Sequence, residues 1–226
     1  MKWFVSLAFA AAALSAQTVC QPVLSYSPCE IVFELNAAEQ QTHPKPYWTV
    51  DLRAEIRSPK FKTYQVYAFA DGPTRMVIRF SPTEPGSWAF RLTSNLPRFN
   101  GKEGTFGATP SDHPGFIQVK NVRHFAYEES KKPHLWFGDT LMHFGSMDRA
   151  AFEQTVEARA KDKFNHMRGY LLGEDPKKVY EAADSPNFAY FRELDKRVRF
   201  LNEKGFTVDL VLGHAKNQLD WMLVSR

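Results

Sequence analysis

The hydrophobic period of this sequence changes near residue 120, and that change limits the folds that the chain can adopt. From about Glu30 to Lys120, apolar and polar residues alternate as they do in half-buried antiparallel strands. The alternation is clearest from Trp48 to Ile56, and it recurs in Ile31–Leu35, Met76–Phe80 and Trp88–Leu92. Alternating strands with a turn about every 8–12 residues are typical of a β-sandwich of about 100 residues. No helix signal interrupts this half.

Turn-forming and aromatic residues refine the prediction for the first half. The segment 82–86, Pro-Thr-Glu-Pro-Gly, separates two alternating runs, which we therefore expect to pair as a β-hairpin. The alternation places Trp48 and Trp88 inward, as core residues. It leaves Tyr47 and Tyr67 free to face outward, where an aromatic ring can stack on a sugar.

From about Asn121 onward, short apolar runs alternate with helical patterns. We expect strands at His134–Phe137, His166–Leu172 and Phe206–Leu212, the last of them buried on both faces. Apolar residues repeat every four positions from Phe152 to Phe164 and predict the first helix.

A second helix is predicted between the last two of these strands. Ser185-Pro186 has the pattern of an N-cap followed by proline at the first helical position. Apolar residues follow at helical spacing from Phe188 to Leu201, and Gly205 is placed to end the helix. The order strand, helix, strand, helix, strand predicts a parallel sheet with crossover helices.

The first 16 residues have the pattern of a secretory signal peptide. Met1-Lys2 is basic, residues 3–14 are almost wholly apolar, and Ser15-Ala16 offers a small-residue cleavage site. The apolar run is shorter than the roughly 20 residues that span a bilayer. We therefore expect a secreted or periplasmic product of a bacterium, with no stable membrane insertion after cleavage.

The two cysteines, Cys20 and Cys29, follow the cleavage site closely. In an exported protein, two nearby thiols are expected to form a disulfide. A lipoprotein anchor at Cys20 is the alternative, but the bulky Val19 before it does not suit that cleavage.

Composition and missing motifs exclude several classes of function. The net charge is +4, but the basic residues are scattered, so we expect no binding to nucleic acid. The sequence has no Gly-x-Ser-x-Gly, His-Glu-x-x-His, Cys-x-x-Cys or glycine-rich phosphate loop. It therefore predicts no cofactor and no metal.

Several short motifs carry a resemblance to a known family. They are Phe69-Ala-Asp-Gly72, Arg79-Phe-Ser-Pro82, Glu84-Pro-Gly-Ser-Trp88, Thr93-Ser-Asn95 and Gly101-Lys-Glu-Gly-Thr-Phe106. In this order they resemble the β-sandwich domain of unknown function 5060, which precedes certain secreted bacterial glycoside hydrolases. The resemblance implies an immunoglobulin-like β-sandwich at residues 17–120, after the signal peptide at 1–16.

The second half resembles the start of the (β/α)8 barrel of apiosidase-like and DUF4038 glycosidases. The matching segments are Trp136-Phe-Gly-Asp-Thr140, Arg159 to Asn165, Pro186-Asn187 with Tyr190-Phe191, Asp195, and Glu203-Lys-Gly205. A complete barrel needs about 250 residues and eight strands. Residues 121–226 supply three, so we expect an incomplete TIM barrel, its first three βα units. The usual catalytic carboxylates follow strands four and seven, which are missing.

Four residues are candidates for substrate binding: Asp139, His143, Arg168 and His214. Asp139 and His214 follow predicted strands at the edge where barrel active sites assemble. The resemblance implies a substrate-binding or carboxylate role for Asp139. The alternatives are a cap on the next turn for Asp139, a helix-entry position for His143, and an ordinary loop position for His214. For Arg168 the alternative is an ion pair with Asp209 on the neighbouring strand.

Other carboxylates are weaker candidates. Glu174 and Asp175 also follow a predicted strand, but a solvated loop is their default interpretation. Asp195 matches the family pattern within a predicted helix, where helix-surface charge is the alternative. Glycosidic cleavage needs two carboxyls about 5–5.5 Å or 6.5–9.5 Å apart. No pair can be assigned to that task, so the catalytic residues stay unassigned.

The resemblance implies the N-terminal portion of a secreted glycoside hydrolase-like protein that acts on plant or microbial polysaccharides or oligosaccharides. Such a truncated chain is expected to be inactive, so whether it is an enzyme stays open. The alternative is a non-catalytic carbohydrate-binding or adhesion module, and a degenerate remnant is a third possibility. In the first two cases the expected partner is a carbohydrate.

Overall fold

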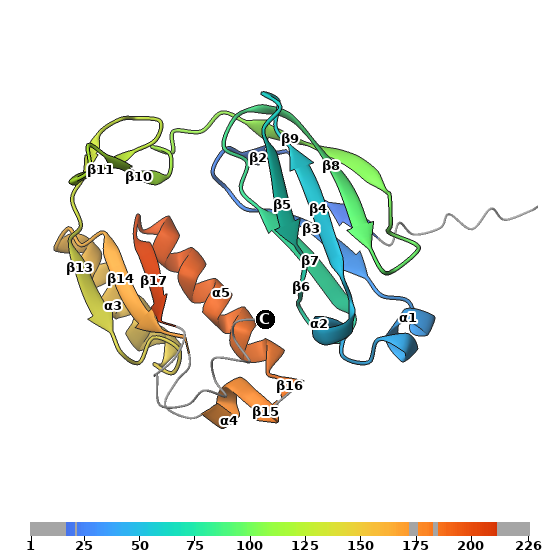
Figure 1. Ribbon diagram of the computed structural model, residues 1–226. Coiled ribbons are helices and arrows are strands. Elements are labelled where there is room, and N and C mark those ends of the chain that lie inside the picture. The colour runs from blue at the N-terminus through green and yellow to red at the C-terminus, as the bar shows by residue number, and fades with distance from the viewer. Residues whose placement is uncertain (1–16, 21, 172–175, 183–184, 212–226) are drawn as a thin grey trace, which may run out of the picture. The chain divides into compact units, whose positions relative to one another are not determined.

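The fold is that of a computed structural model, shown in Figure 1. The residues that it describes are 17–20, 22–171, 176–182 and 185–211. The chain forms two compact units. The first ends at Phe116 and also includes Glu128–Ser130, and the second consists of Ile117–Tyr127 and the chain from Lys131 on. The domain limits that the sequence suggests, 17–120 and 121–226, stay a prediction.

The first unit consists of β-strands and two short helices (Figure 1). In chain order its elements are β1 (Gln17–Val19), β2 (Val23–Leu24), β3 (Cys29–Glu34), α1 (Ala37–Thr42), α2 (Pro46–Thr49), β4 (Leu52–Arg57), β5 (Thr63–Tyr67), β6 (Phe69–Ala70), β7 (Arg75–Phe80), β8 (Gly86–Ser94) and β9 (Glu103–Thr109).

Two sheets of the first unit share one hydrophobic core. One sheet has the strand order β1-β3-β7-β6 and the other the order β2-β9-β8-β4-β5. Alternate residues of β3, β4 and β8 are buried, as the period of two predicts. The core includes Ile31 and Phe33 from one sheet and Ile56, Trp88 and Phe90 from the other.

The predicted hairpin between the runs at 76–80 and 88–92 is wrong. Strand β7 belongs to the four-stranded sheet, whereas β8 belongs to the five-stranded sheet. The segment 82–86 therefore crosses from one sheet to the other. Turn-forming residues show where a strand ends, but they do not show which sheet the next strand joins.

Helices α1 and α2 interrupt the first half, contrary to the prediction. Asn36 and Glu39 form a capping box at the start of α1, and Pro46 is the first residue of α2. Because Trp48 lies on α2 instead of a strand, it is 39% exposed, and its predicted place in the core is wrong. Trp88 is fully buried, as predicted.

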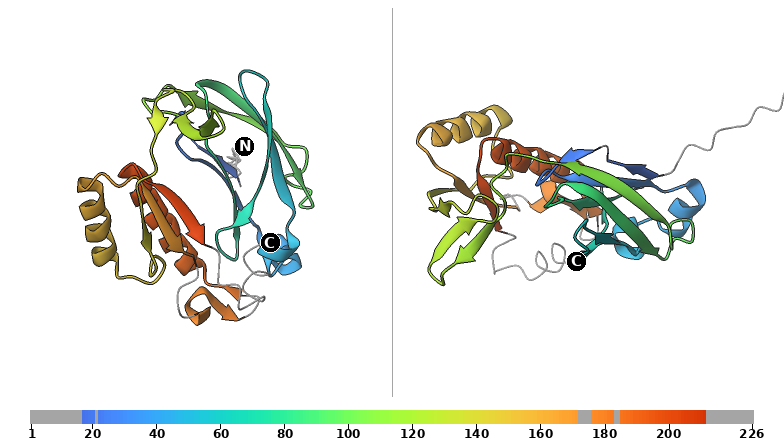
Figure 2. Two further views of the ribbon diagram at one scale, coloured as in Figure 1. Left: turned by 60° about the vertical axis from the view of Figure 1, so that its left-hand side comes forward. Right: turned by 90° about the horizontal axis from the view of Figure 1, so that it is seen from above.

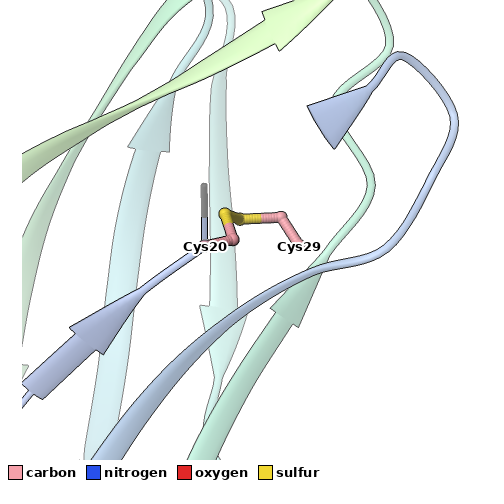
Figure 3. The surroundings of a disulfide bond; sticks show 2 residues. All are labelled: Cys20 and Cys29. Atoms are coloured by element: carbon pink, nitrogen blue, oxygen red, sulfur yellow. A yellow bond between two sulfur atoms is a disulfide. The ribbon is translucent and has the colours of Figure 1, made fainter. Parts of the chain in front are cut away.

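A disulfide joins the end of β1 to the start of β3 (Figure 3). Cys20 follows the last residue of β1, and Cys29 is the first residue of β3. Their Cα atoms are 5.5 Å apart, within the usual range for a disulfide. The register that pairs Val19 with Ile31 brings these two chain segments together.

The second unit contains two small antiparallel sheets, β10-β11-β12 and β15-β16, and one parallel sheet (Figures 1 and 2). In chain order its elements are β10 (Ile117–Lys120), β11 (His124–Tyr127), β12 (Pro133–His134), β13 (Gly138–Leu141), α3 (Arg149–Lys161), β14 (His166–Tyr170), α4 (Pro176–Val179), β15 (Tyr180–Ala182), β16 (Ser185–Pro186), α5 (Phe188–Glu203) and β17 (Thr207–Val211).

The parallel sheet has the order β13-β14-β17, and α3 and α5 cover one of its faces. Phe152 and Val156 of α3 and Leu194 and Leu201 of α5 share a core with Met167 of β14. Both crossover helices therefore pack on the same side of the sheet. The predicted parallel pairing and the two crossover helices are confirmed, but α4, β15 and β16, which the sequence did not predict, lie between β14 and α5.

The first parallel strand begins later than the predicted strand His134–Phe137. Only the first residue of that segment lies in a strand, β12, and β13 begins at Gly138. The side chain of Asn165 explains the difference. It accepts a hydrogen bond from Phe137 N at 2.9 Å and donates one to Leu135 O at 2.7 Å. These bonds satisfy the backbone without a sheet partner.

Two further boundaries in the second unit are corrected. Ser185–Pro186 forms β16, and α5 begins at Phe188 with Asn187 as its N-cap, whose side chain accepts a hydrogen bond from Tyr190 N. The helix ends before Gly205, as predicted, where φ is +85°. Strand β17 is not buried on both faces, since Leu210 is 39% exposed.

Candidate functional site

One face of the parallel sheet, which we call the polar face, carries charged side chains. Parallel register places Thr140, Arg168 and Asp209 side by side on it, on the side away from α3 and α5. Arg168 Nη2 lies 2.7 Å from Asp209 Oδ2, and Arg168 Nε lies 3.2 Å from the same oxygen. The side chains are about half exposed, at 55% and 48%. Arg168 thus forms the ion pair that was the alternative to a substrate role.

His166 extends this pair into a small network. Its Nδ1 lies 2.9 Å from Thr207 Oγ1, and its Nε2 lies 3.4 Å from Asp209 Oδ2. The hydrogen bond from Arg168 is the main cause that lowers the pKa of Asp209, and the neighbouring His166 adds to it. Asp209 is therefore a carboxylate over the whole neutral range, positioned as a hydrogen-bond acceptor.

Aromatic side chains adjoin the network on the side of His166. The Trp136 ring lies edge-on, 4.8 Å from the His166 ring and 4.6 Å from the His134 ring. Tyr127 Oη lies 2.9 Å from His134 Nδ1, and burial lowers the pKa of His134. His134 Nε2 is buried and makes no hydrogen bond with the described part of the chain.

The sequence does not predict this aromatic cluster. The predicted strand His134–Phe137 contains both His134 and Trp136 but does not show that they meet His166. Their i, i+2 spacing before the first parallel strand was the available signal.

Asp139 lies on the opposite face of the sheet. It pairs in register with Met167, whose side chain packs among the helices. Arg159 of α3 donates from Nε to Asp139 Oδ2 at 2.6 Å, and this hydrogen bond is the main cause that lowers the pKa of Asp139. Its predicted position after the end of a parallel strand is wrong, because Asp139 is the second residue of β13.

Asp139 and Asp209 lie on opposite faces of the parallel sheet, which determines whether they can act on one substrate. A glycosidic bond is cleaved between two carboxyls that flank one substrate on the same side of the protein scaffold. Asp139 and Asp209 are separated by the sheet, and each binds an arginine. These two residues therefore do not form such a pair, and the substrate-binding role predicted for Asp139 stays a prediction.

The remaining candidates lie elsewhere. His143 is exposed in the loop between β13 and α3, at the carboxyl end of the strand. Asp195 lies within α5, as predicted, and is half-buried. His214, Glu174 and Asp175 lie outside the described residues. The structure therefore brings Arg168 and Asp209 together. Asp139 lies on the other face of the sheet, and His143 lies in the loop after β13.

The described residues include neither a metal-binding cluster nor a membrane-spanning helix. No group of three or more His, Cys, Asp or Glu side chains in this part of the chain is placed to hold a metal ion. No helix within the same residues is long and apolar enough to cross a membrane.

Comparisons with known families match both halves. The family model for the domain of unknown function DUF5060 matches residues 22–95. The family model described as "Apiosidase-like, catalytic domain" matches residues 119–225. Among curated proteins no match was found.

A solved structure supports the fold. A "putative glycoside hydrolase" from Bacteroides vulgatus ATCC 8482 matches with a TM-score of 0.72 and 23% identity, over 85% of this chain and 41% of that one. The chain therefore spans less than half the length of this neighbour, and at this identity the likeness shows the fold alone.

Two further solved structures match more weakly. The Lin-41 filamin domain matches at a TM-score of 0.31 and 14% identity, over 43% of this chain and 88% of that one. A family 39 glycoside hydrolase from Bacteroides cellulosilyticus WH2 matches at 0.27 and 12%, over 93% and 35%.

The chain is a mostly β, multidomain protein. Its matches show a resemblance to glycoside hydrolases. Residues 22–95 are similar to DUF5060 and residues 119–225 to an apiosidase-like catalytic domain, in that order, so the resemblance drawn from the sequence is confirmed.

Proposed function

We propose that this chain is the N-terminal portion of a secreted glycoside hydrolase-like protein that acts on plant or microbial polysaccharides or oligosaccharides. The observation that carries the proposal is the match of residues 119–225 to an apiosidase-like catalytic domain. In this proposal the chain by itself does not hydrolyse glycosides.

The parallel sheet supports an interpretation as the first three βα units of a TIM barrel. Its strand order follows the chain order, and α3 and α5 pack on the same face. A doubly wound sheet has helices on both faces, whereas a barrel has them only outside. In a barrel the polar face, with Arg168 and Asp209, would line the interior.

The first unit supports an interpretation as an immunoglobulin-like β-sandwich, because its two sheets share one core. The order of basic, apolar and small residues at 1–16 supports export, with cleavage after Ala16. Mass spectrometry of the product released by an expressing bacterium tests this part. A mature chain that begins near Gln17 is expected, and a retained Met1 would contradict it.

Hydrolysis is tested with the purified chain, a panel of aryl glycosides and plant polysaccharides. No turnover is expected, because the two described carboxylates of the parallel sheet, Asp139 and Asp209, lie on opposite faces of it. An Asp139→Asn variant serves as the comparison. Clear turnover that this substitution abolishes would overturn the proposal, since it would place the catalytic machinery within these three strands.

The alternative is a non-catalytic carbohydrate-binding or adhesion module. The observation that favours it is the set of exposed aromatic rings on the first unit: Tyr67 is 62% exposed, and Trp48 is 39% exposed beside Tyr47. Affinity electrophoresis in gels that contain plant polysaccharides distinguishes this alternative from the glycoside hydrolase proposal. Retardation of the wild type that Tyr67→Ala abolishes favours the module, whereas retardation that survives Tyr67→Ala and Trp48→Ala does not.

A further inference from the structure

Helix α5 carries a buried arginine in the core of the second unit. Arg197 is 4% exposed, and its guanidinium carbon lies 5.0 Å from the centre of the Phe152 ring. It donates from Nη1 to Phe144 O at 2.7 Å and from Nη2 to Met147 O at 2.6 Å. Its Nε lies 3.3 Å from Glu193 Oε1. Two of the three donor groups are therefore directed at the main chain of one loop.

Packing alone does not explain the buried guanidinium of Arg197. Burying a guanidinium is costly, and an apolar side chain of similar volume often packs in such a place at no loss of stability. What an apolar side chain cannot do is bind two carbonyl groups three residues apart. Arg197 therefore fixes the backbone of residues 142–147, which lie between β13 and Asp148, the N-cap of α3.

The loop is held from its inner side and exposed on its outer side. Phe144 is fully buried over Gly169, where an added Cβ would lie 2.5 Å from the Phe144 side chain. The amides of Ser146 and Met147 donate to His143 O at 3.0 and 2.8 Å. The loop is thus a closed turn, with the His143 side chain on its exposed part.

A second residue of α5 fixes the end of the neighbouring strand. Tyr190 donates from its hydroxyl to Leu171 O at 2.8 Å, directly after β14. The same hydroxyl leaves no room for a side chain at Gly145, in the loop that Arg197 binds. One helix therefore holds the chain that follows β13 and the chain that follows β14 in a fixed relation.

We propose that Arg197 is a positioning residue, which holds loop 142–147 so that the His143 imidazole is presented to a sugar hydroxyl at the carboxyl edge of the sheet. Carboxyl edges of parallel strands are where barrel proteins place their sites. An imidazole there can donate or accept a hydrogen bond from a hydroxyl group. The ligand part of this inference rests on the proposed function, whereas the positioning part does not.

The positioning part is tested by hydrogen exchange of the full chain without ligand. In Arg197→Met, the amides of Ser146 and Met147 are expected to exchange at least ten times faster than in the wild type. The amides of Met167 and Leu201 should exchange as before, which separates release of the loop from general destabilisation. Lys196→Met, an exposed neighbour on the same helix, is the matched control and should change neither set.

Arg197→Lys keeps the charge and part of the donor capacity, so exchange at Ser146 and Met147 should be intermediate. It also replaces the methionine variant if that protein does not fold. Loop exchange in both variants equal to that of the wild type would overturn the positioning role.

The ligand part is tested by NMR of the His143 imidazole during titration with methyl glycosides of xylose, arabinose, glucose and galactose. A saturable shift is expected with at least one of them in the wild type and in Lys196→Met, and its loss is expected in Arg197→Met. Absence of any shift in the wild type would refute the sugar role of the loop, even if the exchange result upholds the role of Arg197. Retention of the shift in Arg197→Met would refute the link between the two.

Discussion

In the first unit, Ile31 and Phe33 of one sheet and Ile56 and Phe90 of the other lie in the same core, so each sheet covers the inner face of its neighbour. In the second unit, Met167 is buried under α3 and α5, but Arg168, the next residue along the strand, is exposed on the polar face. The first unit therefore covers both of its inner faces with its own strands, whereas among the described residues helices cover only one face of the parallel sheet.

The exposed polar face is unusual for a parallel sheet. Parallel sheets are normally covered on both faces, whereas antiparallel sheets often have one solvated face. The exposed side chains of Leu135, Trp136 and Phe137 lie in the same unit, at 81%, 41% and 48% exposure. We therefore expect the first unit to be the more stable one, and four sets of substitutions test that comparison.

The largest effect is expected from Trp88→Ala in the first unit. Trp88 is fully buried beside Tyr64, Phe80 and Phe106, and removal of a buried tryptophan costs about 3–5 kcal/mol. Urea unfolding followed by hydrogen exchange should show loss of protection in β4, β8 and β9, with α5 unchanged.

Tyr67→Ala is the matched control, because this ring is 62% exposed and its loss should change stability by less than about 0.5 kcal/mol. Equal loss of protection in α5 after Trp88→Ala would show that the two units unfold together, and the comparison would fail.

The next effect is expected from the double substitution Cys20→Ser and Cys29→Ser. The disulfide closes a short loop, and the chain-entropy model gives a contribution of about 2–3 kcal/mol for such a loop. The urea midpoint of the first unit should fall and that of the second should not. Reduction of the wild-type disulfide should reproduce the change, and an unchanged midpoint after either treatment would contradict it.

Two glycine substitutions compare packing in the two units. A Cβ at Gly169 would lie 2.5 Å from Phe144, so Gly169→Ala should destabilise the second unit by about 1–3 kcal/mol. A Cβ at Gly107 in β9 would lie 3.6 Å from Pro22, an ordinary contact, so Gly107→Ala should be neutral. Thermal unfolding followed by circular dichroism measures both. Similar effects of the two substitutions would contradict the packing seen around Phe144.

The smallest effect is expected from Asp139→Asn, which removes the ion pair with Arg159. Both side chains are more than one third exposed, so the loss at neutral pH should be at most about 1 kcal/mol. Because Arg159 lowers the pKa of Asp139, the contribution is present above the unfolded-state pKa of about 3.9 and is lost as the pH falls through the lower folded-state pKa.

Thermal unfolding of this variant and the wild type at pH 7, 5 and 3 tests the prediction. The difference in stability should be constant from pH 7 to 5 and smaller at pH 3. Glu203→Gln, at an exposed position on α5, is the control for loss of one charge. A difference that grows at low pH would contradict the ion pair.

The strands of the first unit could be predicted because the pleat of a half-buried strand shows directly as a period of two. The prediction failed at Trp48. This residue continues the alternation, but it lies in the helix that begins at Pro46. The partner of β8 could not be predicted either, because the choice of sheet depends on packing between strands far apart in the sequence.

In the second unit, the ion pair between Arg168 and Asp209 could be foreseen because the two residues occupy matching positions on neighbouring parallel strands. The contacts of Arg197 could not, because they join a helix to carbonyl groups about 50 residues earlier in the chain. Asp139 was misplaced for a local reason: the side chain of Asn165 delays the start of β13.

The order β13-β14-β17 also bears on how the second unit is made. Each parallel strand pairs with the parallel strand made before it, but each pairing spans a whole crossover, and such non-local pairing is slow to form. During synthesis on the ribosome, β14 can dock on β13 before β17 exists, and no finished pair has to open to admit a later strand. The three parallel strands can therefore pair stepwise in the direction of translation.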